Sequence, residues 1–472
     1  MLLEHIYDPD LAQGSYLIGC QVDNTAVVVD PRRDIQVYLD IAAREGMEIV
    51  AVTETHIHAD YLSGTLELAN ATGAQVYVSD EGGPDWTYGA GFNDAVRMKH
   101  GYQITIGNIT IEAIHTPGHT PEHLAFLVTD GAQTSEPGFM LSGDFVFVGD
   151  LGRPDLLDAA AGGIDTRFGG ARDLFASLRD HFLTLPDYVQ VLPAHGSGSA
   201  CGKALGAVPT TTIGYERNFS WWGKYLENDD MDGFVEELLS SQPDAHSYFG
   251  RMKVQNRQGP AILGELPELI EYSPDDLKPL LDRQEKIFVD TRHHTERYDA
   301  AVDGALSIPD ASKAATHIAW AYNPEEEERE LVIFAQNQEE AASYRDHFIR
   351  VGVDVLTGYV PTLDGLLGDG VPVMTLEELA SGTSNHLLDM RNITEYAAGF
   401  IPGAQQLAAS RVLWNQDQLP QDTPIVVYCA SGRRAAVGAS ALRRAGHHVI
   451  ELDGNFGTWA AIPGNNPTLV DV

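Results

Sequence analysis

Short apolar runs recur along the 472-residue chain, and segments with helical periodicity lie between them. Apolar runs bounded by turn residues are typical of buried strands, so this alternation predicts an α/β protein. The stretch 17–29 instead predicts a β-hairpin that turns at Asp23 and Asn24, with Cys20 buried in its first strand. The runs that matter most for function are residues 49–52, 139–141, 188–192, 331–334 and 424–428.

Four turns next to predicted strands carry side chains that can bind a metal ion. The run 49–52 leads into Thr55-His56-Ile57-His58-Ala59-Asp60-Tyr61, and the three later turns carry His119, Asp144 and His195. Imidazole and carboxylate groups are the ligands of zinc and of non-haem iron. The His-x-His pair taken alone is equally well explained as a coincidence at a strand end. The four turns together predict a metal site.

The order of these residues resembles the signature of the metallo-β-lactamase superfamily, which is His-x-His-x-Asp-His followed by a His, an Asp and a final His. The chain departs from this signature at Tyr61, which stands where the family has a ligand for a second metal ion. The resemblance implies an N-terminal αββα sandwich. The departure favours a single metal ion in it.

Within this superfamily, Thr-His-x-His-Ala-Asp and residues 143–155 are similar to persulfide dioxygenases, which use one Fe(II). The resemblance implies that His56, His119 and Asp144 bind one Fe(II) per chain and leave coordination positions open for substrate sulfur and dioxygen. It places the remaining residues of the signature beside the metal or in the substrate cleft: His58, Asp60, Tyr61 and His195. Tyr61 is either a packing aromatic residue or a hydrogen-bond donor to bound oxygen or substrate.

Two further residues are candidates for the substrate cleft. Cys201 lies in a glycine-rich segment, residues 196–203, which we expect to be a flexible loop at the rim of the metal site. It is either an ordinary loop thiol or one that holds a persulfide or meets the substrate. Arg217 either binds a substrate carboxylate or forms an ordinary surface ion pair.

A second motif, a cysteine loop between a predicted strand and a predicted helix, lies near the C-terminus. The apolar run 424–428 is followed by Cys429-Ala430-Ser431-Gly432-Arg433-Arg434, and helical periodicity continues from Ala435. A thiol in a loop that opens a helix is stabilised as an anion by backbone N–H groups and by the positive end of the helix. This loop resembles the rhodanese active loop, Cys-x-x-Gly-x-Arg. The resemblance implies Cys429 and Arg434 as catalytic residues and residues 430–433 as the sulfur-binding loop; a phosphatase loop is the alternative.

An internal repeat precedes this loop. Val289-Asp290-Thr291-Arg292 echoes Leu388-Asp389-Met390-Arg391, and the run 331–334 is followed by Ala335 where the repeat requires a cysteine. Two glutamates, Glu339 and Glu340, also stand where an anionic sulfur species would need positive charge. The middle copy is therefore expected to be a non-catalytic rhodanese-like domain that serves packing or assembly.

The motifs divide the chain near residues 260 and 372. The expected architecture is α/β throughout, with a metallo-β-lactamase domain at 1–260, an inactive rhodanese-like domain at 261–371 and an active one at 372–472. Three domains of roughly 100–200 residues agree with the chain length. The candidate linkers are residues 256–260 and 368–372.

Composition excludes some partners. Thirty basic and 68 acidic residues give a formal charge of −38, which disfavours nucleic acid and anionic membranes. The chain contains no run of 18 apolar residues, so no membrane span is expected. Three cysteines do not make a disulfide framework, so we expect a reducing compartment and a cytoplasmic protein. The non-catalytic copy leads us to expect a homo-oligomer.

Taken over the whole chain, the resemblance implies a fusion of a persulfide dioxygenase with a rhodanese. The first activity oxidises a low-molecular-weight persulfide with O2 to thiol and sulfite. Cys429 then transfers sulfane sulfur to sulfite and produces thiosulfate. The alternatives are a zinc-dependent thioester hydrolase similar to glyoxalase II and a non-enzymatic sulfur sensor. Glutathione, coenzyme A, bacillithiol and cysteine all remain open as the thiol carrier.

Overall fold

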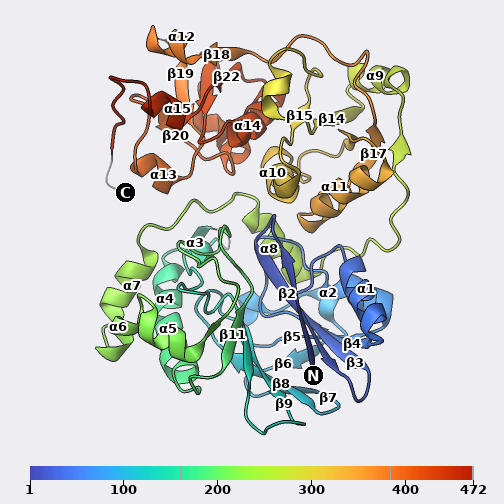
Figure 1. Ribbon diagram of the computed structural model, residues 1–472, viewed down its shortest axis with the longest axis vertical. Coiled ribbons are helices and arrows are strands. Elements are labelled where there is room, and N and C mark those ends of the chain that lie inside the picture. The colour runs from blue at the N-terminus through green and yellow to red at the C-terminus, as the bar shows by residue number, and fades with distance from the viewer. Residues whose placement is uncertain (160–161, 383, 470–472) are drawn as a thin grey trace. The chain divides into compact units, whose positions relative to one another are not determined.

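The computed structural model describes residues 1–159, 162–382 and 384–469. It divides into two compact units (Figure 1). Unit 1 comprises Met1–Ala245 and Phe249–Leu266, and unit 2 comprises His246–Tyr248 and Pro267–Val472. Each unit has its own sheets and its own buried cores. The metal-site motif therefore belongs to unit 1, whereas the cysteine loop belongs to unit 2.

Unit 1 contains two six-stranded sheets. The strands of the first sheet follow the chain order: β1 (Leu2–Asp8), β2 (Gln13–Cys20), β3 (Thr25–Val29), β4 (Glu48–Thr53), β5 (Gln75–Ser79) and β6 (Val96–Met98). The second sheet runs in the reverse of chain order: β12 (Thr211–Thr212), β11 (Gln190–Pro193), β10 (Phe139–Gly143), β9 (Leu124–Asp130), β8 (Ile109–His115) and β7 (Gln103–Ile106).

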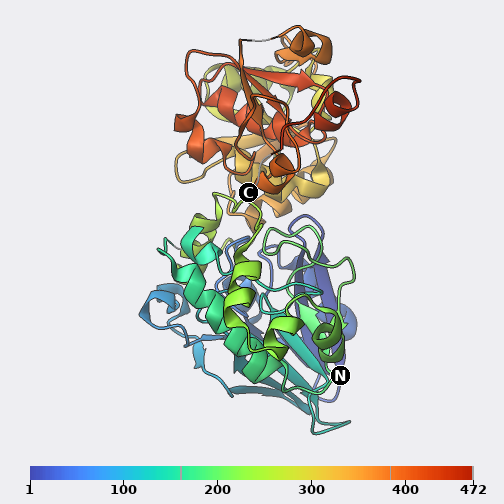
Figure 2. The same cartoon turned by 90° about the vertical axis from the view of Figure 1, so that its left-hand side faces the viewer.

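The helices of unit 1 lie outside these sheets, as Figures 1 and 2 show. Their bounds are α1 (Gln36–Glu45), α2 (Thr65–Thr72), α3 (Leu156–Ala159), α4 (Thr166–Ser177), α5 (Ile213–Phe219), α6 (Gly223–Glu227), α7 (Met231–Leu239) and α8 (Phe249–Gln258). Short helical turns occur at η1 (Pro84–Trp86), η2 (Ala90–Phe92) and η3 (Leu178–Phe182).

The alternating direction of side chains along each strand explains the layers of unit 1. In β3, Val27 and Val29 join a core that also contains Ile111 and Phe126 of the second sheet. Their neighbour Val28 faces the opposite way and packs in the core that contains helix α1. Successive side chains of a strand point to opposite faces, so each sheet buries one face against the other sheet and one against helices. The expected αββα sandwich is confirmed.

The predicted hairpin is also confirmed. Strands β2 and β3 pair antiparallel, with Cys20 opposite Thr25, and the turn includes Asp23 and Asn24. Cys20 is buried. The first candidate linker was wrong, because residues up to Gln258 form helix α8. Asn256 of this helix is fully buried and donates hydrogen bonds to the carbonyls of His58 and Tyr61.

Unit 2 contains two five-stranded sheets with the same strand order. The first is β13 (Ile270–Glu271), β17 (Leu356–Val360), β16 (Glu330–Phe334), β14 (Lys286–Asp290) and β15 (Leu306–Ser307). The second is β18 (Val373–Thr375), β22 (Val449–Asp453), β21 (Ile425–Tyr428), β19 (His386–Asp389) and β20 (Gln405–Gln406). In each sheet, the strand that comes first in the chain pairs with the strand that comes last. The strand that is fourth in chain order lies at the centre of the sheet.

The helices of unit 2 follow the strands in matching positions. The first copy has α9 (Pro274–Asp282), η4 (His294–Arg297), η5 (Ala311–Lys313), α10 (Ala314–Ala321) and α11 (Gln338–Arg350). The second has α12 (Leu376–Ala380), α13 (Ile393–Ala397), η6 (Val412–Gln418), α14 (Arg433–Arg444) and α15 (Phe456–Ala460).

The repeat extends to individual side chains. Arg292 pairs with Asp290 in the first copy, and Arg391 pairs with Asp389 in the second, each with 2.6 Å between Nη2 and Oδ2. Ala335 directly follows the central strand β16, as Cys429 directly follows β21. The middle copy therefore has the same chain path as the last one but carries a methyl group in place of the thiol.

Buried polar contacts join the two copies within unit 2. Arg297 of the first copy donates from Nη2 to both carboxylate oxygens of Glu451 in the second, at 2.9 and 3.0 Å. Arg443 donates to the same carboxylate at 2.8 Å. Arg297 and Glu451 are almost completely buried.

Among the described residues, no helix combines the length and apolar character that crossing a membrane requires.

Candidate functional site

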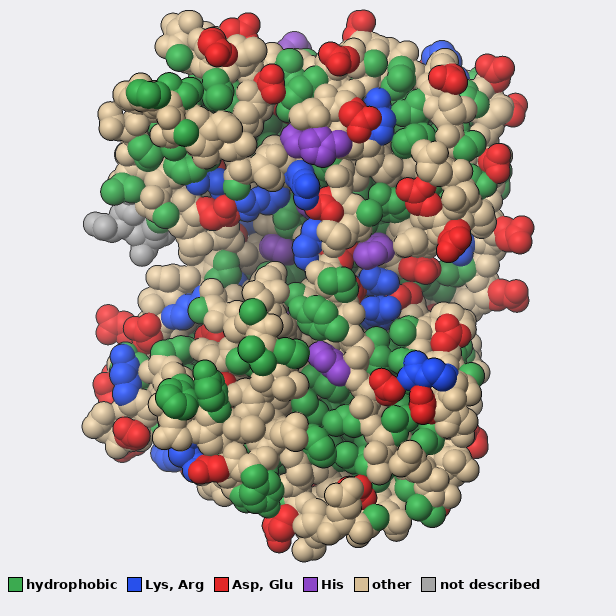
Figure 3. Space-filling model, viewed as in Figure 1, with side chains coloured by type: hydrophobic (Ala, Val, Ile, Leu, Met, Phe, Trp, Pro, Cys, Tyr) green, Lys and Arg blue, Asp and Glu red, His purple; other side chains and the backbone are tan. Residues whose placement is uncertain are grey.

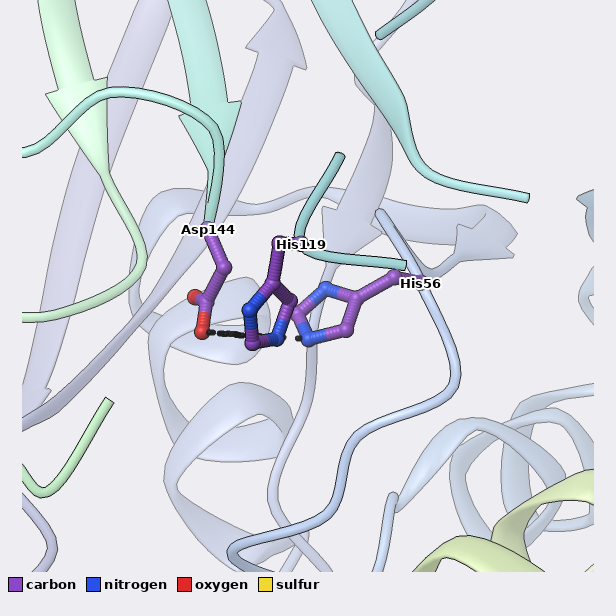
Figure 4. Close-up of side chains that lie close together, drawn as sticks. All are labelled: His56, His119 and Asp144. Atoms are coloured by element: carbon purple, nitrogen blue, oxygen red, sulfur yellow. Dashed lines mark ion pairs between the residues drawn. The ribbon is translucent and has the colours of Figure 1, made fainter. Parts of the chain in front are cut away.

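Three predicted metal ligands converge in unit 1. His56 lies just after β4, His119 lies between β8 and β9, and Asp144 directly follows β10. Figure 4 shows their side chains pointing toward one another. Oδ2 of Asp144 lies 3.4 Å from Nε2 of His119 and 3.9 Å from Nε2 of His56. With bonds of about 2.1 Å, two ligands of one ion lie at most ~4.2 Å apart, so these distances fit a shared ion.

Hydrogen bonds show which nitrogen of His119 can face a cation. Its Nδ1 lies 3.2 Å from the carbonyl oxygen of Arg153, which only accepts, so Nδ1 carries the proton. Nε2 then presents a lone pair toward Asp144, whose two carboxylate oxygens are buried without a hydrogen-bond partner. A lone pair facing a carboxylate is repulsive unless a cation lies between them. Burial also lowers the pKa of His119 and, well below its usual value, that of His56.

Asp30 supports His56 and was not predicted from the sequence. Its carboxylate accepts hydrogen bonds from the backbone N–H of Thr55 at 2.7 Å and from the Thr55 hydroxyl at 2.9 Å. The same hydroxyl lies 2.9 Å from Nδ1 of His56. Asp30 follows the apolar strand β3, which is the signal that identified Asp144 at the end of β10.

His123 supports Asp144 in a comparable way and was also missed. Its Nε2 accepts a hydrogen bond from the backbone N–H of Asp144 at 3.0 Å. Its Nδ1 must therefore carry the proton and donates to the hydroxyl of Thr116 at 2.8 Å. The imidazole is fully buried. The signal in the sequence was a second histidine four residues after His119.

Two other residues of the signature, His58 and Tyr61, form their hydrogen bonds with Asp30 instead of with the three ligands. Nε2 of His58 lies 3.0 Å from Oδ1 of Asp30. Burial lowers the pKa of His58, but the charge of Asp30 and the hydrogen bond to it raise that pKa to about 9. The Tyr61 hydroxyl donates to the carbonyl of Asp30 at 3.1 Å and accepts from the amide of Gln13 at 3.2 Å. These contacts favour the interpretation of Tyr61 as a packing aromatic residue.

Asp60, His195 and Cys201 form a second buried group. One potential ligand atom from each lies within 4.8 Å of the others. Cys201 lies in a loop beside the metal-site motif, as expected, but its side chain is only 3% exposed. Polar contacts on both sides of Cys201 tie its loop to the residues after β10. Burial, together with the nearby charges of Asp60 and Asp144, raises the pKa of the thiol well above its usual value.

Arg217 is engaged elsewhere. It forms an ion pair with Asp187 and donates hydrogen bonds to the carbonyls of Leu183 and Leu185. About a third of its side chain is exposed. These contacts correspond to the surface ion pair that was the alternative to a substrate-binding role.

A cavity of about 600 Å³ adjoins the loop that carries His119. Gly118 and Pro121 line it on either side of His119 in the sequence, and Trp86, Lys253 and Arg257 line it further along. Nζ of Lys253 lies 3.6 Å from the centre of the Trp86 ring. Burial lowers the pKa of Lys253 to about 8. The cavity thus combines an aromatic surface with two basic side chains and two acidic ones, Asp85 and Asp173.

In unit 2, the loop after β21 surrounds the sulfur of Cys429. Its Sγ accepts hydrogen bonds from the backbone N–H groups of Gly432 at 3.1 Å and Ala435 at 3.4 Å. Gly432 has φ of +87°, a conformation that other residues rarely adopt. The 12-residue helix α14 begins immediately afterwards. These N–H groups and the positive end of the helix can stabilise a thiolate or a persulfide anion.

Both arginines of the loop are paired with carboxylates. Arg434 donates two hydrogen bonds to Glu395, at 2.6 and 2.8 Å, and Arg433 donates to Asp310 of the middle copy at 2.6 Å. Ala430 and Ser431 are exposed, so the loop is open to solvent at its tip. Figure 3 shows basic side chains gathered between α13 and α14, whereas acidic ones are scattered over the rest of the viewed face.

The middle copy also touches the loop through His294, which the sequence did not reveal. A methyl group added to Gly432 would meet Nε2 of His294 at 2.3 Å, so the imidazole packs directly against this glycine. His294 is 7% exposed. Burial and the positive groups of His293, Arg297 and Arg433 lower its pKa to about 4, against the opposite effect of Glu451.

Comparisons with known proteins agree with this division. A model of the metallo-beta-lactamase superfamily matches residues 9–195, and a model of the rhodanese-like domain matches residues 374–462. A solved structure described as a metallo-beta-lactamase from Staphylococcus aureus subsp. aureus COL is 34% identical, with a TM-score of 0.68. The match covers 76% of this chain and 99% of that one.

Two curated relatives match the N-terminal part at lower coverage. A mitochondrial persulfide dioxygenase of Mus musculus is 27% identical over 167 residues, which are 34% of this chain and 59% of the relative. A hydroxyacylglutathione hydrolase-like protein of Homo sapiens is 32% identical over 141 residues, which are 29% of this chain and 44% of the relative. The chain thus matches only about half the length of these two proteins.

Proposed function

Because the chain belongs to the metallo-beta-lactamase superfamily and ends in a rhodanese-like domain, we propose that it couples persulfide oxidation to sulfur transfer. Unit 1 oxidises a low-molecular-weight persulfide with dioxygen and water to a thiol, sulfite and two protons. Unit 2 transfers a second sulfane sulfur to sulfite. We assign the activities to residues 1–260 and 372–472, with a non-catalytic copy at 261–371 between them.

The observation that carries the first activity is the geometry of His56, His119 and Asp144. Two neutral imidazoles and one carboxylate are the protein ligands of many Fe(II) oxygenases, and they leave coordination positions open. Fe(II) held by these residues supplies the redox chemistry that joins dioxygen to sulfane sulfur. The protein residues orient the ligands, through Asp30 and Thr55 on one side and His123 on the other.

The cavity next to His119 is the proposed site for the thiol carrier. Trp86 offers an apolar surface, while Lys253 and Arg257 can pair with anionic groups of the carrier, and Asp85 and Asp173 can pair with its amino groups. Glutathione and coenzyme A both carry such groups.

The second activity uses Cys429. Its thiolate accepts the outer sulfur of a persulfide donor, so that one S–S bond forms while the donor's S–S bond breaks and the donor leaves as a thiolate. Sulfite then attacks the sulfur held on Cys429, forms the S–S bond of thiosulfate and releases the Cys429 thiolate. The N–H groups of Gly432 and Ala435 stabilise the sulfur anion at both stages.

The runner-up function is zinc-dependent thioester hydrolysis, which the human hydroxyacylglutathione hydrolase-like relative supports. Asp60 and His195 retain part of a second metal site near the first. The loss of a histidine at Tyr61 argues against this function.

We also propose that the protein is cytoplasmic and forms a homo-oligomer. The support for the compartment is the small number of cysteines, since three in 472 residues do not make a disulfide framework.

Metal analysis combined with an oxygen electrode tests the proposal. Protein loaded separately with Fe(II) and Zn²⁺ would be assayed with glutathione persulfide, coenzyme A persulfide and a glutathione thioester. We expect persulfide-dependent oxygen uptake by the iron form and equimolar sulfite in the absence of sulfur transfer. Thioester cleavage by the zinc form without oxygen uptake by the iron form would support the hydrolase instead.

A further inference from the structure

A cavity of about 430 Å³ is lined by both copies of unit 2. Its lining includes Arg297 and Val302 of the middle copy, Ser440 and Arg443 of helix α14 in the second copy, and the linker residues 368–372. This volume lies within the range of small-molecule sites, about 300–1,000 Å³. We propose that the cavity binds a free α-amino acid in its zwitterionic form. No residue of the candidate metal centre or of the cysteine loop lines it, so this inference is independent of the proposed persulfide chemistry.

Arg297 has a hydrogen-bond donor that the protein leaves unused. Its Nη2 donates to both carboxylate oxygens of Glu451. Its Nε is buried and has no partner among the described residues. A buried guanidinium N–H without an acceptor costs free energy, so a bound ligand that supplies an acceptor is favoured. A carboxylate matches the planar geometry of a guanidinium group better than other acceptors do.

The buried side of the cavity carries more positive than negative charge. Arg297 and Arg443 both pair with the single carboxylate of Glu451. The three nitrogens of Arg443 already donate to Glu451 and to the carbonyl of Val449, so Arg443 supplies charge and Arg297 supplies the free N–H. Burial and the charge of Arg297 lower the pKa of Arg443, against the opposite effect of Glu451. A ligand carboxylate would provide the missing negative charge.

Two aspartates give the cavity acidic groups as well. Asp303 and Asp369 line it, and both residues are exposed. Their charges disfavour a simple anion such as sulfate or phosphate. A ligand that carries an ammonium group beside its carboxylate can pair with the aspartates and with Arg297 at the same time. An α-amino acid has this pair of charges.

Backbone contacts hold the linker against the middle copy. The N–H of Gly368 donates to the carbonyl of Ala301 at 2.8 Å. Gly370 lies so close to the middle copy that a Cβ atom added to it would be 1.9 Å from the carbonyl oxygen of Tyr298. The linker can therefore pack in this position only with a glycine there. A cavity with fixed walls loses little conformational entropy when a ligand binds.

Helix α14 is also tied to the middle copy beside the cavity. The Ser440 hydroxyl accepts a hydrogen bond from the backbone N–H of Ser307 at 3.0 Å, and both residues are buried. Arg444 donates to the carbonyl of Gly304 at 2.9 Å. Because both copies line the cavity, it exists only while they are packed together. Ligand binding should therefore stabilise unit 2 against unfolding.

Thermal unfolding tests the site without reference to catalysis. The full-length protein would be heated with each of the common proteinogenic amino acids at millimolar concentration, and titration calorimetry would measure the Kd of the best one. We expect this amino acid to raise Tm. Its amide lacks the carboxylate and its deaminated analogue lacks the ammonium group, and each should bind about fivefold more weakly or worse.

Two variants test the two ends of the ligand. Arg297→Lys keeps a positive charge beside Glu451 but removes the planar guanidinium, and it should weaken binding about tenfold. The double variant Asp303→Asn, Asp369→Asn should weaken binding of the amino acid about fivefold, without weakening that of the deaminated analogue. The double variant changes only exposed side chains, so it remains informative if Arg297→Lys does not fold.

Asp364→Asn is the matched control, because Asp364 is exposed in the same part of the chain but does not line the cavity. It should bind the amino acid like the parent protein. The proposal would be overturned if no amino acid raised Tm or bound in calorimetry. Equal affinities for the amino acid, its amide and its deaminated analogue, or an unchanged affinity in the double variant, would overturn it as well. All of these measurements report binding, so a failure of the proposed persulfide oxidation would not affect them.

Discussion

The backbone N–H of Asp144 donates a hydrogen bond to Nε2 of His123, at 3.0 Å, in a fully buried part of unit 1. This bond fixes the main chain of a metal-ligand candidate, and Thr116 fixes the His123 ring in turn. The position of the Asp144 carboxylate therefore depends on His123, which is not one of the three candidate ligands.

His123→Ala should therefore weaken metal binding. Removal of comparable supporting residues typically costs about 10–100-fold in metal affinity. A competition titration with a chromogenic chelator would measure the change. The control is His115→Ala, because His115 lies in the same region but contacts the carbonyl of Pro121. Equal affinities of His123→Ala and the parent protein would contradict the proposed support.

His119→Ala and Asp144→Ala should each abolish iron binding and oxygen uptake, because each removes one of three protein ligands. Sulfur transfer from thiosulfate to cyanide should continue, since Cys429 belongs to the other unit. Elemental analysis and an oxygen electrode would check the first result and a thiocyanate assay the second. Full iron occupancy in Asp144→Ala would show that the ligand assignment is wrong.

Tyr61→Phe should reduce stability while leaving oxygen uptake unchanged. The substitution removes the hydrogen bonds to Gln13 and to the carbonyl of Asp30, at a cost of about 1 kcal/mol in the free energy of unfolding. Denaturant unfolding of the metal-loaded protein would measure this loss. A large fall in oxygen uptake without loss of stability would instead support direct contact of Tyr61 with oxygen or substrate.

Cys429→Ser should change the product. Sulfite is expected to accumulate where the parent protein makes thiosulfate, and oxygen uptake should continue. Chromatography of the sulfur anions after persulfide oxidation would check this, with correction for the uncatalysed reaction. Cys20→Ser is the control, because that thiol is buried in β2. Thiosulfate formation at the parental rate by Cys429→Ser would exclude Cys429 as the sulfur carrier.

His294 should make unit 2 sensitive to acid. Its pKa is about 4 in the folded protein, below the ordinary value of 6.5, so the fold favours the neutral imidazole. The unfolded chain therefore binds more protons between these values, and stability is lost as the pH falls from about 6.5 toward 4. A pKa difference of this size corresponds to a loss of about 3 kcal/mol over the whole interval.

Denaturant unfolding of the full chain at pH 7 and pH 5 would test this dependence. His294→Gln should lose less stability than the parent protein over this interval. His448→Gln, at an exposed position in the same unit, should behave like the parent. An unchanged pH dependence in His294→Gln would show that the group responsible lies elsewhere.

Local patterns in the sequence predicted the α/β alternation, the repeat and the ligand turns, whereas the sandwich followed from the family resemblance. Strand ends are marked by apolar runs, so His56 and Asp144 could be recognised from short stretches of the chain. The similar position of Asp30, at the end of β3, was not recognised because no second ligand stands beside it. The burial of Cys201 could not be predicted, because it depends on contacts from Asp150 and Arg153 across the fold.

The contacts between the two copies of unit 2 also could not be predicted from the sequence. Asp310 and His294 reach the cysteine loop from residues that are more than 100 positions earlier in the chain. Neither stands in a pattern that distinguishes it from an ordinary surface or core residue. Arg217 was ambiguous for the same reason, since an arginine on a helix can pair with any carboxylate that the fold brings near.

The buried pair of Arg297 and Glu451 imposes unequal evolutionary constraints on the duplicated halves of unit 2. Ala335 carries no thiol, and its methyl group can form neither a hydrogen bond nor an ion pair with the other copy. Losing Arg297 would leave the carboxylate of Glu451 with only Arg443, and breaking a buried ion pair typically costs about 3–5 kcal/mol. Selection can therefore relax on the catalytic loop of the first copy while it continues to preserve the surface that supports the second.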